Sequence, residues 1–280
     1  MNSYKEHYQK CKELYLGTPS ANVGARYVDL YDVRLLGNPI PLSDPHYMNL
    51  IAELSVKVSS FFDTNKEDIM SLSNSVRVKS FKKIPEVVPL IDYIAPYLEE
   101  RVFQSNLKVE HAHLYRSLPN TFPESSWVWH YDNCPDEYIK LGIYLNDVSK
   151  HSGPMQVMCG GGNEFYKLDT SALDNSKSGK SNRKNKRKFT KIDGGKTARA
   201  PHSFIEQIRS EQYDSKSIVG PRGTNFLFNP NILHRATVPA PRMHRDALFL
   251  FIRPSLNPVK YKLEDFEYNS KIDVKDYEYD

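Results

Sequence analysis

The chain contains little cysteine and no long apolar segment. Its three cysteines, Cys11, Cys134 and Cys159, form no CxxC pair, which excludes a disulfide framework and fits reduced thiols in the cytoplasm. The longest purely apolar run, Ala247–Ile252, has six residues, whereas a membrane-spanning helix needs roughly 20. The amino terminus lacks the apolar core of a secretory signal. We therefore expect a cytoplasmic protein without a membrane partner.

Basic residues are concentrated in one segment. The chain carries 38 basic and 34 acidic residues, a net charge of +4. Residues 177–191 hold eight basic residues and no acidic ones, so the rest of the chain has a net charge of −4. This distribution excludes a generally basic nucleic-acid-binding protein. We assign the run to a basic inserted loop, 169–202, and expect it to be mobile. It is either a solvated segment or a lid that attracts an anionic substrate.

The 280 residues are 39% hydrophobic, enough for one domain spanning 1–280. Residues 1–100 are predicted to be helical, with a short helix in the first 20 residues, one at 46–62 and one between Pro85 and Pro96. Short β-branched and aromatic runs then predict strands up to residue 255, and an acidic surface tail at 261–280. The strands are expected at 107–118, 127–132, 139–148, 155–158, 225–230 and 247–254. The fold class is mainly β with flanking helices (α+β), as an antiparallel sandwich or barrel.

Residues 129–132, Trp-His-Tyr-Asp, carry the main chemical signal. Side chains two apart on an extended chain point to the same side, so His130 and Asp132 converge. An imidazole and a carboxylate are two of the three ligands of the facial triad that holds Fe(II). His234, in the predicted turn after strand 225–228, is the best candidate for the third ligand. Arg245, eleven residues later, would bind a second carboxylate in a bidentate manner.

These residues and their flanks resemble a known family. The segments WHYDN…KLGIYLNDVSKHSGPMQVM and GTNFLFNPNILHRATVPAPRMHRDALFLF are similar to the phytanoyl-CoA dioxygenase (PhyH) family of Fe(II)- and 2-oxoglutarate-dependent oxygenases, over about residues 107–255. The resemblance implies a double-stranded β-helix (jelly roll, cupin-like). It also implies that His130, Asp132 and His234 bind iron and that Arg245 binds the C5 carboxylate of the cosubstrate 2-oxoglutarate. No catalytic residue beyond the metal ligands is expected.

The implied reaction is hydroxylation of a small or carrier-bound organic substrate, with consumption of O2 and release of succinate and CO2. Related halogenases lack the carboxylate ligand, so Asp132 favours hydroxylation. Two segments depart from the family pattern. Cys159–Gly162 replaces a PGSH-like segment, and Ala236 replaces a small hydroxylated residue. Both departures concern the substrate pocket and the cofactor contacts rather than the metal.

Other residues of the chain are weaker candidates for a functional site. His244 and Asp246 repeat the His-x-Asp spacing, but no histidine follows them. His111 and His113 share a strand face and are interpreted as structural or outer-shell residues. Arg242 is the alternative to Arg245. Two alternative functions stay open, a jelly roll that binds without catalysis and a nucleic-acid-binding protein that uses its basic loop. The second is disfavoured because residues 177–191 contain a single aromatic residue.

Overall fold

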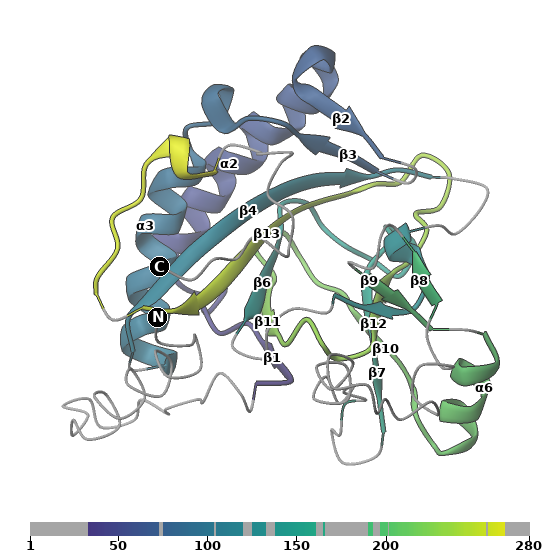
Figure 1. Cartoon of the computed structure of the whole chain (residues 1–280). Coiled ribbons are helices and arrows are strands. Elements are labelled where there is room, and N and C mark those ends of the chain that lie inside the picture. The colour runs from purple at the N-terminus through teal and green to yellow at the C-terminus, as the bar shows by residue number, and fades with distance from the viewer. Residues whose placement is uncertain are drawn as a thin grey trace.

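Two antiparallel β-sheets face each other and form the body of the protein (Figure 1). The computed structural model describes residues 33–72, 75–103, 105–119, 125–132, 138–160, 165, 190–192, 197–200, 202–255 and 257–266. The larger sheet contains, in spatial order, β1 (Leu35–Gly37), β11 (Asn225–Phe228), β6 (Ile139–Tyr144), β13 (Arg245–Pro254), β4 (Leu107–Ser117), β3 (Ser75–Val78) and β2 (Ile69–Ser71). The smaller sheet contains β10 (Asp214–Ile218), β7 (Met155–Cys159), β12 (His234–Ala236), β5 (His130–Tyr131), β9 (Thr197–Arg199) and β8 (Thr190–Ile192). The predicted jelly roll is confirmed.

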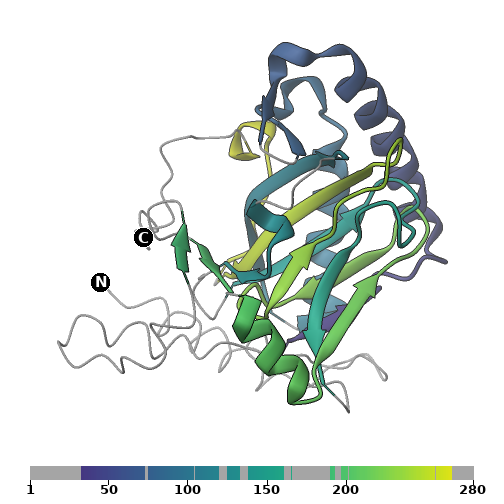
Figure 2. The same ribbon diagram turned by 90° about the vertical axis from the view of Figure 1, so that its right-hand side faces the viewer.

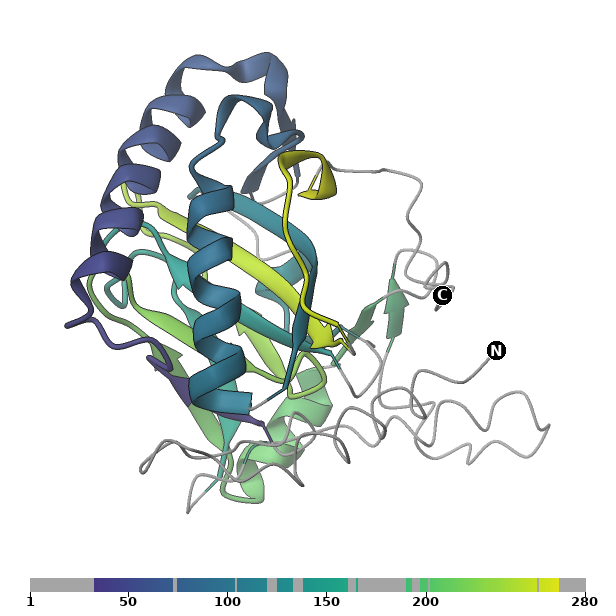
Figure 3. The ribbon, with the colours of Figure 1, turned by 90° about the vertical axis from the view of Figure 1, so that its left-hand side faces the viewer.

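Two long helices, α2 (Pro45–Thr64) and α3 (Val87–Leu98), cover the outer face of the larger sheet (Figure 3). The helix predicted at 46–62 is confirmed, and it is capped by Asp44, whose carboxylate accepts a hydrogen bond from the Tyr47 amide at 2.9 Å. The second helix was expected to end before Pro96, and this was wrong. Proline lacks the amide hydrogen and its ring crowds the carbonyl four residues earlier, but the chain still continues through Pro96 into a π-helical turn, Glu99–Phe103.

Side chains of the larger sheet alternate between the helices and the smaller sheet. On β6 and β13, Leu141 and Leu250 are buried in the main core under the helices. Lys140 and Phe251, which lie opposite each other in the ladder, point to the other side and line a cavity between the sheets. Gly142 lies on that inner face, and a Cβ there would be 2.4 Å from the ring of Phe226. The glycine is therefore required for the aromatic packing on the inner face.

The smaller sheet is covered on its outer side by α6 (His202–Ser210) (Figure 2). Ile205 and Ile208 of this helix pack with Trp129 and Met158. Strands β8 and β9 correct the prediction of a single loop at 169–202. The two strands form because β9 pairs with β5 and with β8, a long-range contact that the polar composition does not show. Helix α6 begins where the predicted loop ends, in a segment for which no helix was predicted. Most of the basic run 177–191 lies outside the described residues.

The first hundred residues contain strands as well as helices, which corrects the prediction of a helical part. β1 pairs with β11, and β3 pairs with β4. Each of these short strands forms through a distant partner, so too few residues share a period for a pattern to be visible. The strand predicted at 127–132 is also shorter than expected, because Ser125–Trp127 forms a 3₁₀ turn and only His130–Tyr131 pair as β5.

The described ends of the chain also differ from expectation. Tyr261 and Phe266 are buried against the core, so residues 261–266 are not a surface tail. The rest of the predicted acidic tail and the predicted helix in residues 1–20 lie outside the described residues. None of the described helices is long and apolar enough to cross a membrane.

The second His-x-Asp pair, His244 and Asp246, contributes to an ion pair within the larger sheet. Arg116 on β4 donates to both oxygens of Asp246 on β13, each at 2.8 Å, and the two side chains are 9% and 4% exposed. His244 is 41% exposed, with its Nε2 at 3.7 Å from Asp246. The Asp246 carboxylate therefore forms an ion pair between the neighbouring strands β4 and β13 and does not line the cavity between the sheets.

Replacing Asp246 with Asn should destabilise the protein by about 2–3 kcal/mol, because it leaves the buried Arg116 guanidinium with Asp63 as its remaining acidic partner. Chemical denaturation measures this change. Glu100→Gln, which breaks the exposed pair with Arg101, is the control and should cost about 0.5 kcal/mol or less. Equal effects for the two variants would contradict the structural assignment of Asp246.

Candidate functional site

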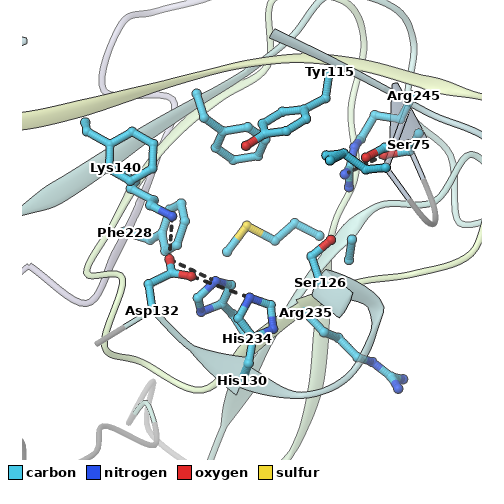
Figure 4. A pocket seen from close by; sticks show the side chains of 16 residues that line it. Ser75, Tyr115, Ser126, His130, Asp132, Lys140, Phe228, His234, Arg235 and Arg245 are labelled. Carbon is cyan, nitrogen blue, oxygen red and sulfur yellow. Dashed lines mark hydrogen bonds and ion pairs between the residues drawn. The ribbon is translucent and has the colours of Figure 1, made fainter. Parts of the chain in front are cut away.

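His130, Asp132 and His234 converge at one end of the cavity (Figure 4). His130 on β5 and His234 on β12 lie directly opposite each other in the smaller sheet, with ring centroids 4.4 Å apart. Asp132 follows β5, and its amide donates to the carbonyl of Pro230 at 3.0 Å. Its two oxygens lie 3.6 Å from the two histidine Nε2 atoms. His234 begins strand β12, rather than lying in a turn as predicted.

Backbone carbonyls orient both imidazoles. The Nδ1 of His130 lies 2.7 Å from the carbonyl oxygen of Val128, and the Nδ1 of His234 lies 2.9 Å from that of Ile232. A carbonyl only accepts, so each Nδ1 carries the proton and each Nε2 presents its lone pair to Asp132. Burial lowers the pKa of His130 and of His234, which keeps both rings neutral at pH 7. This tautomer is the one that binds a metal through Nε2.

The Asp132 carboxylate is kept ionised although it is buried. Burial alone would raise its pKa, but the positive charge of Lys140 outweighs that effect and holds the pKa below its usual range. The ammonium group of Lys140 contacts one Asp132 oxygen. At pH 7 the site therefore presents an ionised carboxylate and two neutral imidazoles.

The donor set fits a divalent transition metal. All three ligand atoms lie within 4.8 Å of one another. Two imidazoles and one carboxylate approaching from one side are the facial triad of non-haem Fe(II) oxygenases, which leaves coordination positions open. Within the described parts of the chain this is the one group of three or more His, Cys, Asp or Glu side chains with such proximity.

The triad opens into a cavity of about 200 Å³ between the two sheets. Aromatic and apolar side chains form much of its wall. The polar lining residues include Ser75, Tyr115, Ser117, Ser126, Lys140 and Arg245. Figure 4 places Arg245 across this space from Asp132.

Arg245 is buried at the first position of β13, as the sequence predicted. Its Nη1 donates to the carbonyl of Gly153 at 2.5 Å, and its Nη2 donates to Ser117 Oγ at 3.0 Å. Gly153 has φ +80°, and a Cβ there would lie 2.8 Å from the carbonyl of Thr237, so this contact requires glycine. Among the described residues no carboxylate lies within ion-pair distance of Arg245, since the adjacent Asp246 pairs with Arg116. The guanidinium is a positive charge in a cavity with unused hydrogen-bonding capacity at Nε.

The alternative candidates lie elsewhere. Arg242 is exposed on the turn before β13. His111 and His113 lie on the inner face of β4, where His113 hydrogen-bonds to the hydroxyl of Tyr115 at 2.9 Å. Arg235 follows a metal-ligand candidate, but its guanidinium stacks on Trp129 and donates to Gln156, pointing away from the centre of Figure 4.

Sequence reasoning missed Lys140, Ser117 and Gly153. Lys140 lies in the run IKLGIY, where a lysine between apolar residues is typical of a solvent-facing strand position. Its inward orientation follows only from the jelly-roll topology, which places this face against the smaller sheet. Serine and glycine contacts to an arginine have no sequence signature of their own.

Comparison with solved structures supports the fold. A structure of EctD from S. alaskensis with 2-oxoglutarate and 5-hydroxyectoine superposes with a TM-score of 0.52 at 11% identity, over 84% of this chain and 79% of that chain. A structure of EctD with bound Fe gives a TM-score of 0.52 at 11% identity, over 88% and 83%. No family model and no curated protein sequence matches the chain. At this identity the likeness shows a shared fold, and the resemblance to phytanoyl-CoA dioxygenases stays a prediction.

His130→Ala and His234→Ala should each weaken Co(II) binding by more than about a hundredfold, because loss of an outer-shell partner alone costs roughly 10–100-fold. Isothermal titration calorimetry measures the affinity. His244→Ala, in the other His-x-Asp pair, is the matched control and should bind Co(II) as the wild type does. Wild-type affinity in the double variant His130→Ala and His234→Ala would contradict the assignment.

Metal affinity should depend little on pH near neutrality. Two histidines with an ordinary pKa of about 6.5 would each be half protonated at pH 6.5, and together they would lower the affinity about threefold between pH 7.5 and pH 6.5. Since burial lowers both pKa values, the neutral forms persist to lower pH. Co(II) affinity should therefore fall less than about twofold from pH 7.5 to 6.5. A threefold or larger fall would contradict the pKa directions.

Proposed function

We propose that the protein is an Fe(II)- and 2-oxoglutarate-dependent dioxygenase that hydroxylates a small or carrier-bound organic substrate. The observation that carries the proposal is the pairing, across one cavity, of a facial triad with a buried arginine that has no acidic partner among the described residues. A dicarboxylate that binds a metal at one end satisfies both requirements.

His130, Asp132 and His234 would hold iron, which supplies the activation of O2 and the oxidative decarboxylation of 2-oxoglutarate. Arg245 would bind the distal carboxylate of 2-oxoglutarate, with its guanidinium fixed by Gly153 and Ser117. A buried guanidinium binds a carboxylate strongly because the two desolvated charges are close and two hydrogen bonds orient them. This contact would set the position of the cosubstrate relative to the metal.

The rest of the wall excludes water from the site. Phe228, Phe249, Phe251 and Met155 line the cavity beside the triad. An apolar wall lowers the local dielectric and protects reactive species from side reactions. The carboxylate ligand Asp132 occupies a position that halogenases, by the resemblance stated above, leave open for a halide. Hydroxylation is therefore the favoured outcome.

A jelly roll that only binds a ligand is the second candidate, and no specific observation favours it. Such a protein has no need for two neutral imidazoles with lone pairs directed at an ionised carboxylate. The proposal is tested by mixing the protein with Fe(II), 2-oxoglutarate and O2 and measuring succinate, with and without a panel of metabolites. If the Fe(II)-loaded protein did not bind 2-oxoglutarate under anaerobic conditions, the proposed function would be overturned.

Arg245→Leu should raise the 2-oxoglutarate concentration for half-maximal succinate release by about a hundredfold, since truncating one partner of a buried charge pair costs 2–5 kcal/mol or more. Arg242→Leu removes an exposed arginine three residues away and should change that 2-oxoglutarate concentration by less than about threefold. If the two effects were reversed, the cosubstrate contact would belong to Arg242.

A further inference from the structure

Lys140 places a second positive charge inside the cavity. Its side chain is 12% exposed, and its Nζ lies 4.2 Å from the ring centroid of Phe251. The same ammonium contacts Asp132. A lysine that is held over an aromatic ring next to a candidate metal ligand has a defined position, unlike a surface lysine.

Lys140 and Arg245 lie at opposite sides of the cavity (Figure 4). In the ladder between β6 and β13, Lys140 is opposite Phe251, and Phe251 is six residues from Arg245 along the strand. At about 3.3 Å per residue, the Cα atoms at the two positions are roughly 20 Å apart along the strand. A 2-oxoglutarate molecule whose distal carboxylate binds Arg245 therefore approaches Lys140 only with its metal-bound end, since Lys140 contacts the metal-ligand candidate Asp132.

The charges near the triad favour an anion at Lys140. Among the described lining residues whose charged groups face the cavity, Lys140 and Arg245 are positive and Asp132 is negative. A divalent cation bound by Asp132 adds two positive charges beside the ammonium and competes with it for the same carboxylate. An anion bound at Lys140 relieves this repulsion, because buried charges are stable only when they are compensated.

Next to Lys140 the wall is apolar, with Phe251 under the ammonium and Phe228, Phe249 and Met155 nearby. The cavity of about 200 Å³ is smaller than the 300–1,000 Å³ typical of ligand pockets. We propose that Lys140 is a substrate-binding residue and that the substrate is a small organic acid, whose carboxylate or phosphate binds Lys140 and whose apolar part packs against these rings. This inference rests on the proposed function.

The role of Lys140 can be tested without turnover. Matched probes are bound to the protein after it has been loaded with Mn(II) and saturated with 2-oxoglutarate. The probes are phenylacetate against phenylacetamide, hexanoate against hexanamide, and phenyl phosphate against phenol, measured by calorimetry. At least one acid should bind the wild type tenfold or more tightly than its neutral counterpart, as expected for a charge-assisted contact. Comparison of the carboxylate pairs with the phosphate pair shows which of the two acidic groups Lys140 prefers.

Lys140→Met, which keeps the aliphatic stem, should reduce that preference to less than about twofold, whereas Lys140→Arg keeps the charge and should retain it. Lys108→Met, on the partly exposed lysine of β4, is the control and should retain it too. Affinities for Mn(II) and for 2-oxoglutarate are measured on Lys140→Met as well, because Lys140 contacts the metal-ligand candidate Asp132.

Two results would overturn the inference while leaving the proposed function intact. One is a wild type that binds no acid more tightly than its neutral counterpart, and the other is an unchanged preference in Lys140→Met. Loss of 2-oxoglutarate binding in Lys140→Met, with the acid preference intact, would assign the lysine to the cosubstrate instead. A Mn(II)-loaded wild type that does not bind 2-oxoglutarate would instead contradict the proposed function itself.

Discussion

The pairing of β5 with β12 is the constraint on which the site depends. Each strand is only two or three residues long, yet their register places His130 opposite His234. The hydrogen bond from the Asp132 amide to Pro230 then fixes the carboxylate between the two rings. Because β12 also pairs with β7, the short contact is held inside a continuous sheet. Ligands far apart in the chain become neighbours through backbone geometry, with carbonyl oxygens setting the orientation of each ring.

Compensation of buried charge gives the cavity its chemical character. Asp246 neutralises Arg116 within the larger sheet, and Asp132 contacts Lys140 at the triad. Arg245 is left without an acidic partner among the described residues. A purely structural arginine would be expected to have one, since burying a guanidinium without an anion is costly. We infer from these charges that the cavity favours negatively charged molecules, which would link the metal site to its proposed cosubstrate.

Much of the fold was predictable where the pattern is local. Helix α2 and strand β13 follow directly from the spacing of their apolar residues, and the triad could be proposed from residue types and order. Three features could not be predicted. Strands β1 and β9 form only through distant partners, and the inward orientation of Lys140 depends on which face of β6 meets the smaller sheet. Sequence spacing suggests which residues are ligands, but only the sheet register places them within reach of one metal.

A crystal structure of the protein grown with Mn(II) and 2-oxoglutarate, with anomalous diffraction used to locate the metal, tests the central claim most directly. The account predicts one strong anomalous peak bound by His130 Nε2, His234 Nε2 and an Asp132 oxygen. It also predicts 2-oxoglutarate on that metal, with its distal carboxylate on the Arg245 guanidinium. A metal bound elsewhere, or a triad that stays metal-free at saturating Mn(II), would contradict the account.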